Sequence, residues 1–161
     1  MKIASVDRAG HMLAVGRHKL RGAAPPTVQG CALVLPFRSA TFEGATMAFG
    51  LRNLPDADAG VAEARRVLKP GARLVILEFV HPAGALARAS HLFGVRFLVP
   101  VVGGLIGGDP GAYRYLARSI EAFLDLDGVA RLVSAHGFRV LERRLLPPRG
   151  PAALVVAEAI A

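Results

Sequence analysis

The sequence lacks the features of secreted, metal-binding and membrane-spanning proteins. Its one cysteine, Cys31, cannot form an internal disulfide, which indicates a reducing compartment such as the cytoplasm. The N-terminus has neither an apolar segment of signal-peptide length nor a cleavage pattern. The histidines lack metal-ligand spacing, and an arginine, a proline and several glycines interrupt the apolar residues 92–108. We therefore expect no metal and no spanning helix, which would need about 20 apolar residues.

Lysine is also scarce, because 17 of the 20 basic residues are arginine. The formal net charge of +8 would suit nucleic acid or an anionic membrane surface, but the basic residues are scattered along the chain. We therefore expect no nucleic-acid partner. A chain of 161 residues that is 53% hydrophobic and 20% charged suits one globular domain with a buried core.

The apolar pattern alternates between strand-like and helix-like segments. The strand-like runs are 2–6, 27–35 (a strand and its exit), 43–49 and 72–80, and the helix-like segments between them are 9–20 and 56–68. Asp56 and Asp58 supply the acceptors and the negative charge that a helix start favours. Lys69, Pro70 and Gly71 end this helix. Alternating strands and helices predict an α/β fold with a doubly wound, mostly parallel sheet.

The C-terminal third continues this pattern and then changes it. Residues 92–108 fit a helical lid or a membrane-surface patch, and two further helices are expected before Gly137. Residues 138–146 and 152–161 read as strands joined by the PPRGP turn. These two strands predict an antiparallel hairpin that finishes the sheet.

Several motifs together resemble one enzyme family. They are FGLRN at 49–53, RVLKPGARLVILEF at 66–79 and YRYLARSI at 113–120, with DRAGHMLAVGRHKL at 7–20 and LPF at 35–37 fitting the same pattern. From about Ala4 to its end, the sequence resembles the ubiquinone/menaquinone biosynthesis C-methyltransferases. The resemblance implies a class I methyltransferase domain with a Rossmann-like sheet. It also implies S-adenosylmethionine bound across the carboxyl ends of the strands, and a prenylated quinol as the substrate.

The resemblance assigns four residues to the cofactor. Asp7 ends the first strand, where a carboxylate can accept both ribose hydroxyls; from spacing alone, an exposed strand-end acid is an equal reading. Cys31 and Ala32 stand where the family usually has Asp or Asn followed by Ala. A thiol is a poor hydrogen-bond acceptor, which leaves the backbone N–H of Ala32 for the adenine. Ala48 belongs to the same expected site.

The resemblance places Arg52 and Asn53 at the reacting ring. Methylation of a quinol carbon needs electron density from a neighbouring phenol oxygen, and a phenol with a pKa of about 10 is mostly protonated at neutral pH. Arginine cannot accept the proton, but its charge can stabilise phenolate and orient a water, and Asn53 can hold that water or the second ring oxygen. The alternative is structural: Arg52 pairs with a nearby acid and Asn53 caps a turn. Phe49, Tyr113 and Tyr115 are expected to line the quinol pocket.

The family begins with a strand and a glycine-rich loop that the sequence does not contain before Lys2. We therefore expect residues 1–161 to form one partial, N-terminally truncated methyltransferase domain. Two functions stay open: a C-methyltransferase of menaquinone or ubiquinone biosynthesis, and a non-catalytic fragment that binds a prenyl tail, a membrane surface or a partner subunit. A homodimer and peripheral contact with the inner face of the membrane are compatible with both.

We predict that this chain alone does not bind S-adenosylmethionine with micromolar affinity. In the family's sheet, the first strand lies between the strands that end at Asp7 and near Phe49, so its loss separates two edges by about 9.6 Å, twice the strand spacing. The cofactor would also lose the backbone N–H groups that face its methionine carboxylate. Isothermal titration of the chain, beside a form extended upstream, tests this expectation. Micromolar binding by the shorter protein would contradict it.

Overall fold

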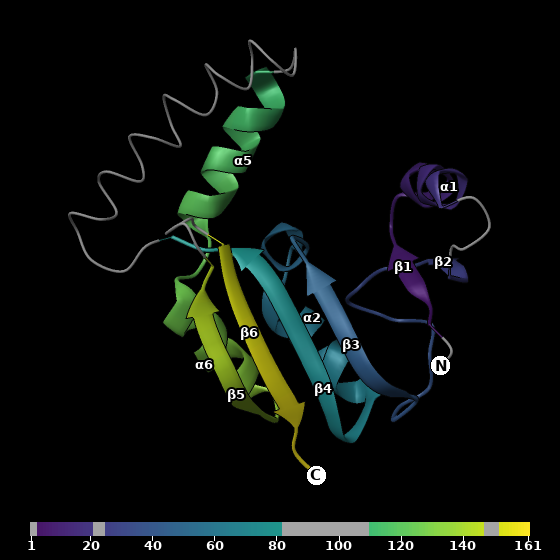
Figure 1. The fold of residues 1–161 in the computed structure, drawn as a ribbon, viewed down its shortest axis with the longest axis vertical. Coiled ribbons are helices and arrows are strands. Elements are labelled where there is room, and N and C mark those ends of the chain that lie inside the picture. The colour runs from purple at the N-terminus through teal and green to yellow at the C-terminus, as the bar shows by residue number, and fades with distance from the viewer. Residues whose placement is uncertain (1–2, 21–24, 82–109, 147–151) are drawn as a thin grey trace.

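The computed structural model describes residues 3–20, 25–81, 110–146 and 152–161, which form two β-sheets with flanking helices (Figure 1). The strands are β1 (Ser5–Asp7), β2 (Thr27–Gln29), β3 (Phe42–Ala48), β4 (Leu68–Phe79), β5 (Phe138–Leu145) and β6 (Ala152–Ala159). The α-helices are α1 (Gly10–Lys19), α2 (Ala57–Val67), α5 (Pro110–Ala122) and α6 (Leu126–Ala135), and η1 (Leu51–Asn53) is a short 3-10 helix. The expectation for residues 92–108 lies outside the described residues.

The strand pairing confirms the predicted α/β arrangement. β1 pairs with β2 in parallel, and β3 pairs with β4 in parallel. β6 is antiparallel to both β4 and β5, as expected of a C-terminal hairpin, and the larger sheet has the order β3-β4-β6-β5. Within the described residues, β1 and β2 form a sheet of their own. Figure 1 shows this smaller unit, with α1, beside β3.

Helix α2 begins as the sequence predicts and ends one residue earlier. The Asp56 side chain caps it by accepting a hydrogen bond from the Ala59 N–H at 2.9 Å. Leu68, which was expected in the helix, is the first residue of β4 and pairs with Phe42. The chain turns directly into the strand at Leu68, whose backbone is extended with a φ of −87° and a ψ of 137°. Gly71, within β4, adopts a φ of +78°, which a residue without a Cβ reaches at little cost.

The hydrophobic core lies between the four-stranded sheet and the helices α2 and α6, which are behind the sheet in Figure 1. Alternate residues of β4 and β6 face this core, so each strand buries one face. Its largest fully buried apolar side chains are Leu51, Val61, Leu68, Leu74, Ile76, Val80, Val129, Val133, Phe138 and Val155. Leu51 belongs to η1, so the turn that carries the FGLRN motif is anchored in the core.

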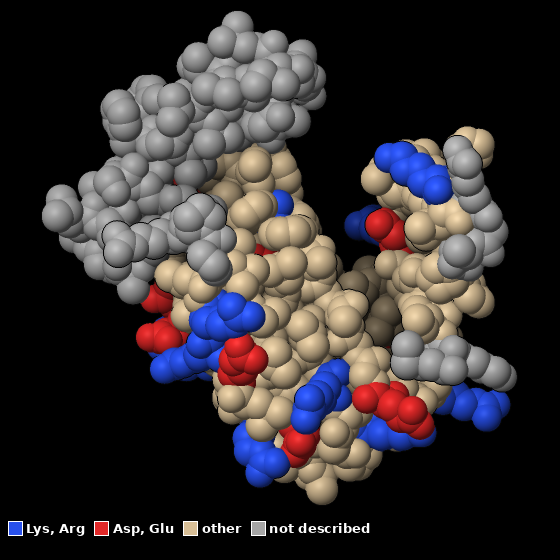
Figure 2. All heavy atoms as spheres, in the orientation of Figure 1, with Lys and Arg blue, Asp and Glu red and all other residues tan. Residues whose placement is uncertain are grey.

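Charged side chains of both signs are interspersed over the lower part of the face shown in Figure 2. On and beside the edge strand β5, the arginines are paired with acids. The pairs are Arg139–Glu158 at 2.6 Å, Arg143–Asp127 at 2.5 Å and Arg144–Glu142 at 2.6 Å. In the described part of the chain, no helix has the length and apolar character needed to cross a membrane.

An ion pair on α2 anchors the loop that follows β2. Glu63 Oε1 accepts hydrogen bonds from the Leu35 N–H at 2.6 Å and from Arg66 Nη2 at 2.7 Å. Arg66 also donates to the carbonyl oxygens of Phe37 and Leu35, at 2.9 and 3.1 Å. The hydrogen bond from Arg66 holds the pKa of the Glu63 carboxyl below its ordinary value. The backbone of the LPF motif is therefore fixed to side chains of α2.

We predict that Glu63→Gln lowers stability near neutral pH by about 1 kcal/mol, because it removes the charge from these hydrogen bonds. The folded pKa of Glu63 lies below the unfolded value, so its stabilisation is present above the unfolded pKa and is lost as the pH falls through the folded one. Urea unfolding of both proteins should give free energies of unfolding that converge as the pH falls below the unfolded pKa and through the lower folded pKa of Glu63. A difference in free energy of unfolding between the two proteins that stays constant with pH would contradict this prediction. Glu142→Gln, on the exposed strand β5, is the control.

Candidate active site

The candidate site begins where β3 ends, at a strained residue. Phe49 has a φ of +54°, in the left-handed region that a bulky residue rarely adopts. Its carbonyl oxygen accepts hydrogen bonds from Arg52 Nη1 at 3.1 Å and from Asn53 Nδ2 at 2.9 Å. Its N–H donates to the Leu77 carbonyl oxygen on β4 at 2.8 Å. The polar pair of the FGLRN motif therefore holds the unusual turn that precedes it.

Arg52 forms a buried ion pair with Glu78, near the end of β4. Arg52 Nη1 lies 2.5 Å from Glu78 Oε1, and the two side chains are 8% and 1% exposed. The structural alternative from the sequence, that Arg52 pairs with an acid, is confirmed, and its catalytic role stays a prediction. Sequence reasoning missed Glu78. The available signal was a carboxylate within the otherwise apolar run of residues 74–80.

An aromatic ring lies against the Arg52 guanidinium, and a second ring packs on the first. The Arg52 Cζ atom lies 5.4 Å from the centroid of the Phe79 ring, and the rings of Phe79 and Phe49 have centroids 4.7 Å apart. A cation over an aromatic face is attracted by the ring quadrupole. The Glu78 carboxylate and the Phe79 ring therefore both hold the guanidinium. Phe49, which packs on Phe79, is 39% exposed.

Helix α5 approaches the same turn through two side chains one helical turn apart. The Tyr115 hydroxyl donates to Asn53 Oδ1 at 2.9 Å, and Arg52 Nε donates to Ser119 Oγ at 3.3 Å. The structure therefore brings Tyr115 to Asn53, while Tyr115 stays exposed. That Tyr115 binds substrate stays a prediction. The Tyr113 side chain lies outside the described residues.

The residues expected at the cofactor lie at or just after the carboxyl ends of β1, β2 and β3. Asp7 is exposed, and its Oδ1 accepts a hydrogen bond from the Ala9 N–H at 2.8 Å. Within the described residues, no hydrogen bond occupies its second carboxylate oxygen. Cys31 and Ala32 lie in the turn that follows β2, and Ala48 is the last residue of β3. An exposed carboxylate with a vacant oxygen fits the ribose hydroxyls of a nucleoside.

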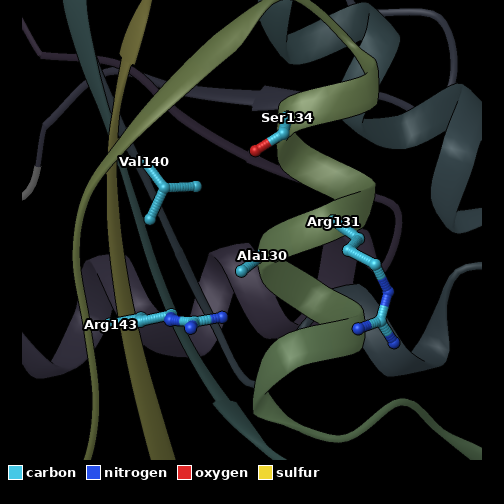
Figure 3. Close-up of a pocket in the computed structure, with 5 residues that line it drawn as sticks. All are labelled: Ala130, Arg131, Ser134, Val140 and Arg143. Atoms are coloured by element: carbon cyan, nitrogen blue, oxygen red, sulfur yellow. The ribbon is translucent and has the colours of Figure 1, made fainter.

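A groove of about 390 Å³ lies elsewhere, between α6 and β5 (Figure 3). It is lined by Ala130, Arg131, Ser134, Val140 and Arg143. Figure 3 shows Arg143 pointing towards α6 and Arg131 pointing away from the strands. Arg143 is already paired with Asp127. None of the residues expected at the site lines this groove, so the candidate site is the turn at the end of β3.

The sequence matches the ubiE/COQ5 methyltransferase family over residues 1–147. It is 42% identical over 142 residues to a demethylmenaquinone methyltransferase of Thermus thermophilus, an alignment that covers 86% of this chain and 64% of that protein. It is 44% identical over 131 residues to the ubiquinone/menaquinone biosynthesis C-methyltransferase UbiE of Saccharophagus degradans, covering 79% and 53%. The chain thus spans less than two thirds of the length of these relatives.

Two solved structures show the same fold. The [4+2]-cyclase SpnF aligns with a TM-score of 0.72 at 15% identity, over 100% of this chain and 67% of that one. A putative methyltransferase from Bacillus halodurans aligns with a TM-score of 0.71 at 16% identity, over 100% and 84%. These alignments confirm the methyltransferase-like α/β fold. At such identities they concern the fold alone, because one fold supports several chemistries.

We predict that the Arg52–Glu78 pair is strongly coupled. Arg52→Met should lower stability by about 3–5 kcal/mol, because it leaves a buried carboxylate without its cation. The double variant Arg52→Met/Glu78→Gln should lose much less than the sum of the two single variants. Urea unfolding of the four proteins measures the coupling. Additive losses would mean that the pair contributes no mutual stabilisation.

Proposed function

The chain belongs to the ubiE/COQ5 methyltransferase family, and from this premise we propose that it carries the quinol-binding part of an S-adenosylmethionine-dependent C-methyltransferase. The proposed substrate is a prenylated quinol of menaquinone or ubiquinone biosynthesis, methylated on a ring carbon. The observation that carries the proposal is the FGLRN turn, where Arg52, Asn53 and the exposed Phe49 ring stand together at the end of β3. The proposed setting is the cytoplasm, where the enzyme meets the inner face of the membrane.

The cofactor residues support this proposal through their chemistry and placement. S-adenosylmethionine, when bound, supplies the methyl group as an electrophile. Asp7 would accept the ribose hydroxyls with its vacant carboxylate oxygen, and the backbone of Ala32 would meet the adenine. Ala48 ends the strand that leads directly into Phe49. The expected cofactor and quinol sites would therefore adjoin at the end of β3.

Arg52 and Asn53 would prepare the quinol ring. The reacting carbon becomes nucleophilic when a neighbouring phenol oxygen loses its proton, and N–H donors aimed at that oxygen stabilise the negative charge. Arg52 cannot take the proton itself, because an arginine guanidinium stays protonated in proteins. A water oriented by these side chains would carry the proton to solvent. Asn53 would orient that water or the second ring oxygen with the hydrogen-bonding capacity that its Phe49 and Tyr115 bonds leave.

A second candidate function is binding without catalysis. It is favoured by one observation: β1 and β2, which carry the expected cofactor residues, form a sheet separate from β3 in the described structure. Such a protein would retain a surface for a prenyl tail, the membrane or a partner subunit. Methyl transfer to a quinol by the protein that contains this chain distinguishes the two functions, since a binding protein would give none.

We predict that Arg52→Lys retains S-adenosylmethionine binding and lowers turnover about 10²-fold in the intact enzyme. Lysine keeps the positive charge but loses the planar set of donors that can align an oxygen and a water. Steady-state kinetics and calorimetric titration of the cofactor measure the two effects. Arg139→Lys, at an exposed arginine of β5, is the matched control. Unchanged turnover in Arg52→Lys would return Arg52 to a purely structural role.

A further inference from the structure

We propose that Glu78 is a positioning residue for Arg52, and that it leaves the Nη2 edge of the guanidinium to hydrogen-bond a ring oxygen of the phenolic substrate. This inference rests on the proposed function and deepens it. It assigns a role to Glu78, which lies in the motif at residues 66–79 and had no role there, and it names the atom of Arg52 that meets the ligand.

Glu78 holds Arg52 at two points. Its Oε1 accepts from Arg52 Nη1 at 2.5 Å, and its Oε2 accepts from the backbone N–H of Arg52 at 3.1 Å. Oε1 also accepts from the N–H of Phe79 at 2.8 Å, which fixes the carboxylate to its own strand. Glu78 is 1% exposed and is the one fully buried charged residue of the described chain. The backbone and the guanidinium of Arg52 are therefore fixed relative to β4 by a single carboxylate.

The donors of the Arg52 guanidinium can be counted. Its Nε donates to Ser119 Oγ, and its Nη1 donates to the Phe49 carbonyl oxygen and to Glu78 Oε1. A guanidinium has five N–H groups, so two remain on Nη2. Within the described residues, no hydrogen bond uses them.

Unused donors on Nη2 need an explanation because the Arg52 side chain is only 8% exposed. Buried N–H groups without acceptors are costly, and they are usually paired with protein, water or ligand. The guanidinium that carries them lies against the Phe79 ring, which packs on the exposed ring of Phe49. Its Nη1 shares the Phe49 carbonyl oxygen with the Asn53 amide, and both Phe49 and Asn53 belong to the proposed quinol site. A ring oxygen of a phenolic ligand is an acceptor of the right kind for this edge.

The ion pair also determines what kind of stabilisation Arg52 can offer. Since Glu78 balances its charge at 2.5 Å, the pair presents directed N–H donors more than net positive charge. Stabilisation by directed donors depends on the position of those donors, and a misplacement of about 1 Å can reduce catalysis about 10²-fold. The function of Arg52 therefore depends on Glu78 even though Glu78 touches no substrate.

The first test needs no turnover. Nuclear magnetic resonance follows solvent exchange of the Arg52 side-chain N–H groups in the intact protein and in Glu78→Gln, with Glu158→Gln as the matched control. Glu158 also pairs with an arginine on the same sheet, at the opposite end of the neighbouring strand. We expect exchange about 10-fold or more faster in Glu78→Gln and unchanged in Glu158→Gln. Unchanged exchange in both variants would overturn the positioning role. If Glu78→Gln does not fold, Glu78→Asp replaces it.

The second test uses 1,4-dihydroxynaphthalene, kept in this quinol form, as a probe. Titration with this probe should shift the resonances of Arg52 Nη2 in the wild type and leave them unshifted in Glu78→Gln. If the wild-type resonances do not shift, Nη2 is not the edge that binds the phenolic oxygen. In the methylation assay, kcat of Glu78→Gln should fall about 10²-fold with little change in KM, and Glu158→Gln should match the wild type. A higher KM with an unchanged kcat would overturn the positioning role. A wild type that shows both resonance effects without methylation contradicts the proposed function and upholds this inference.

Discussion

The buried carboxylate of Glu78 is the constraint on which the candidate site depends. An ionised side chain in this position costs several kcal/mol unless it is paired and hydrogen-bonded. Arg52 supplies both the charge and a backbone N–H, so η1 must lie against the end of β4. Once Arg52 is placed, two of its other donors, on Nη1 and Nε, bind the Phe49 carbonyl oxygen and Ser119 on α5. One electrostatic requirement thus positions a strand end, a turn and a helix.

The sequence predicted those parts of the fold that depend on local chemistry. The start of α2 followed from Asp56, and the C-terminal hairpin followed from two alternating apolar runs separated by a proline-rich turn. The end of α2 was placed one residue late, because strand pairing of Leu68 with Phe42 outweighed the helical spacing. Such pairing joins residues 26 positions apart, and no local pattern contains it.

The family resemblance proposed the residues of the candidate site, and the sequence did not predict their contacts. FGLRN identified Arg52 and Asn53 through a family resemblance, whereas spacing alone favoured a turn. Glu78 escaped notice because one acid in a buried strand gives no periodic signal, and its partner is 26 residues away. The positive φ of Phe49 was equally hidden, since that conformation is expected of glycine or asparagine. Both features arise from tertiary contacts.

The left-handed turn at Phe49 has a consequence for the order in which parts of the protein unfold. A bulky residue in this conformation is held by its surroundings, and it relaxes when they loosen. The hydrogen bonds to its carbonyl oxygen come from the side chains of Arg52 and Asn53 and are partly exposed to solvent. The core strands β4 and β6 have no comparable strain in their described residues. Thermal opening should therefore reach this turn before the sheet, so that heat inactivates the protein at a temperature below the one that melts it.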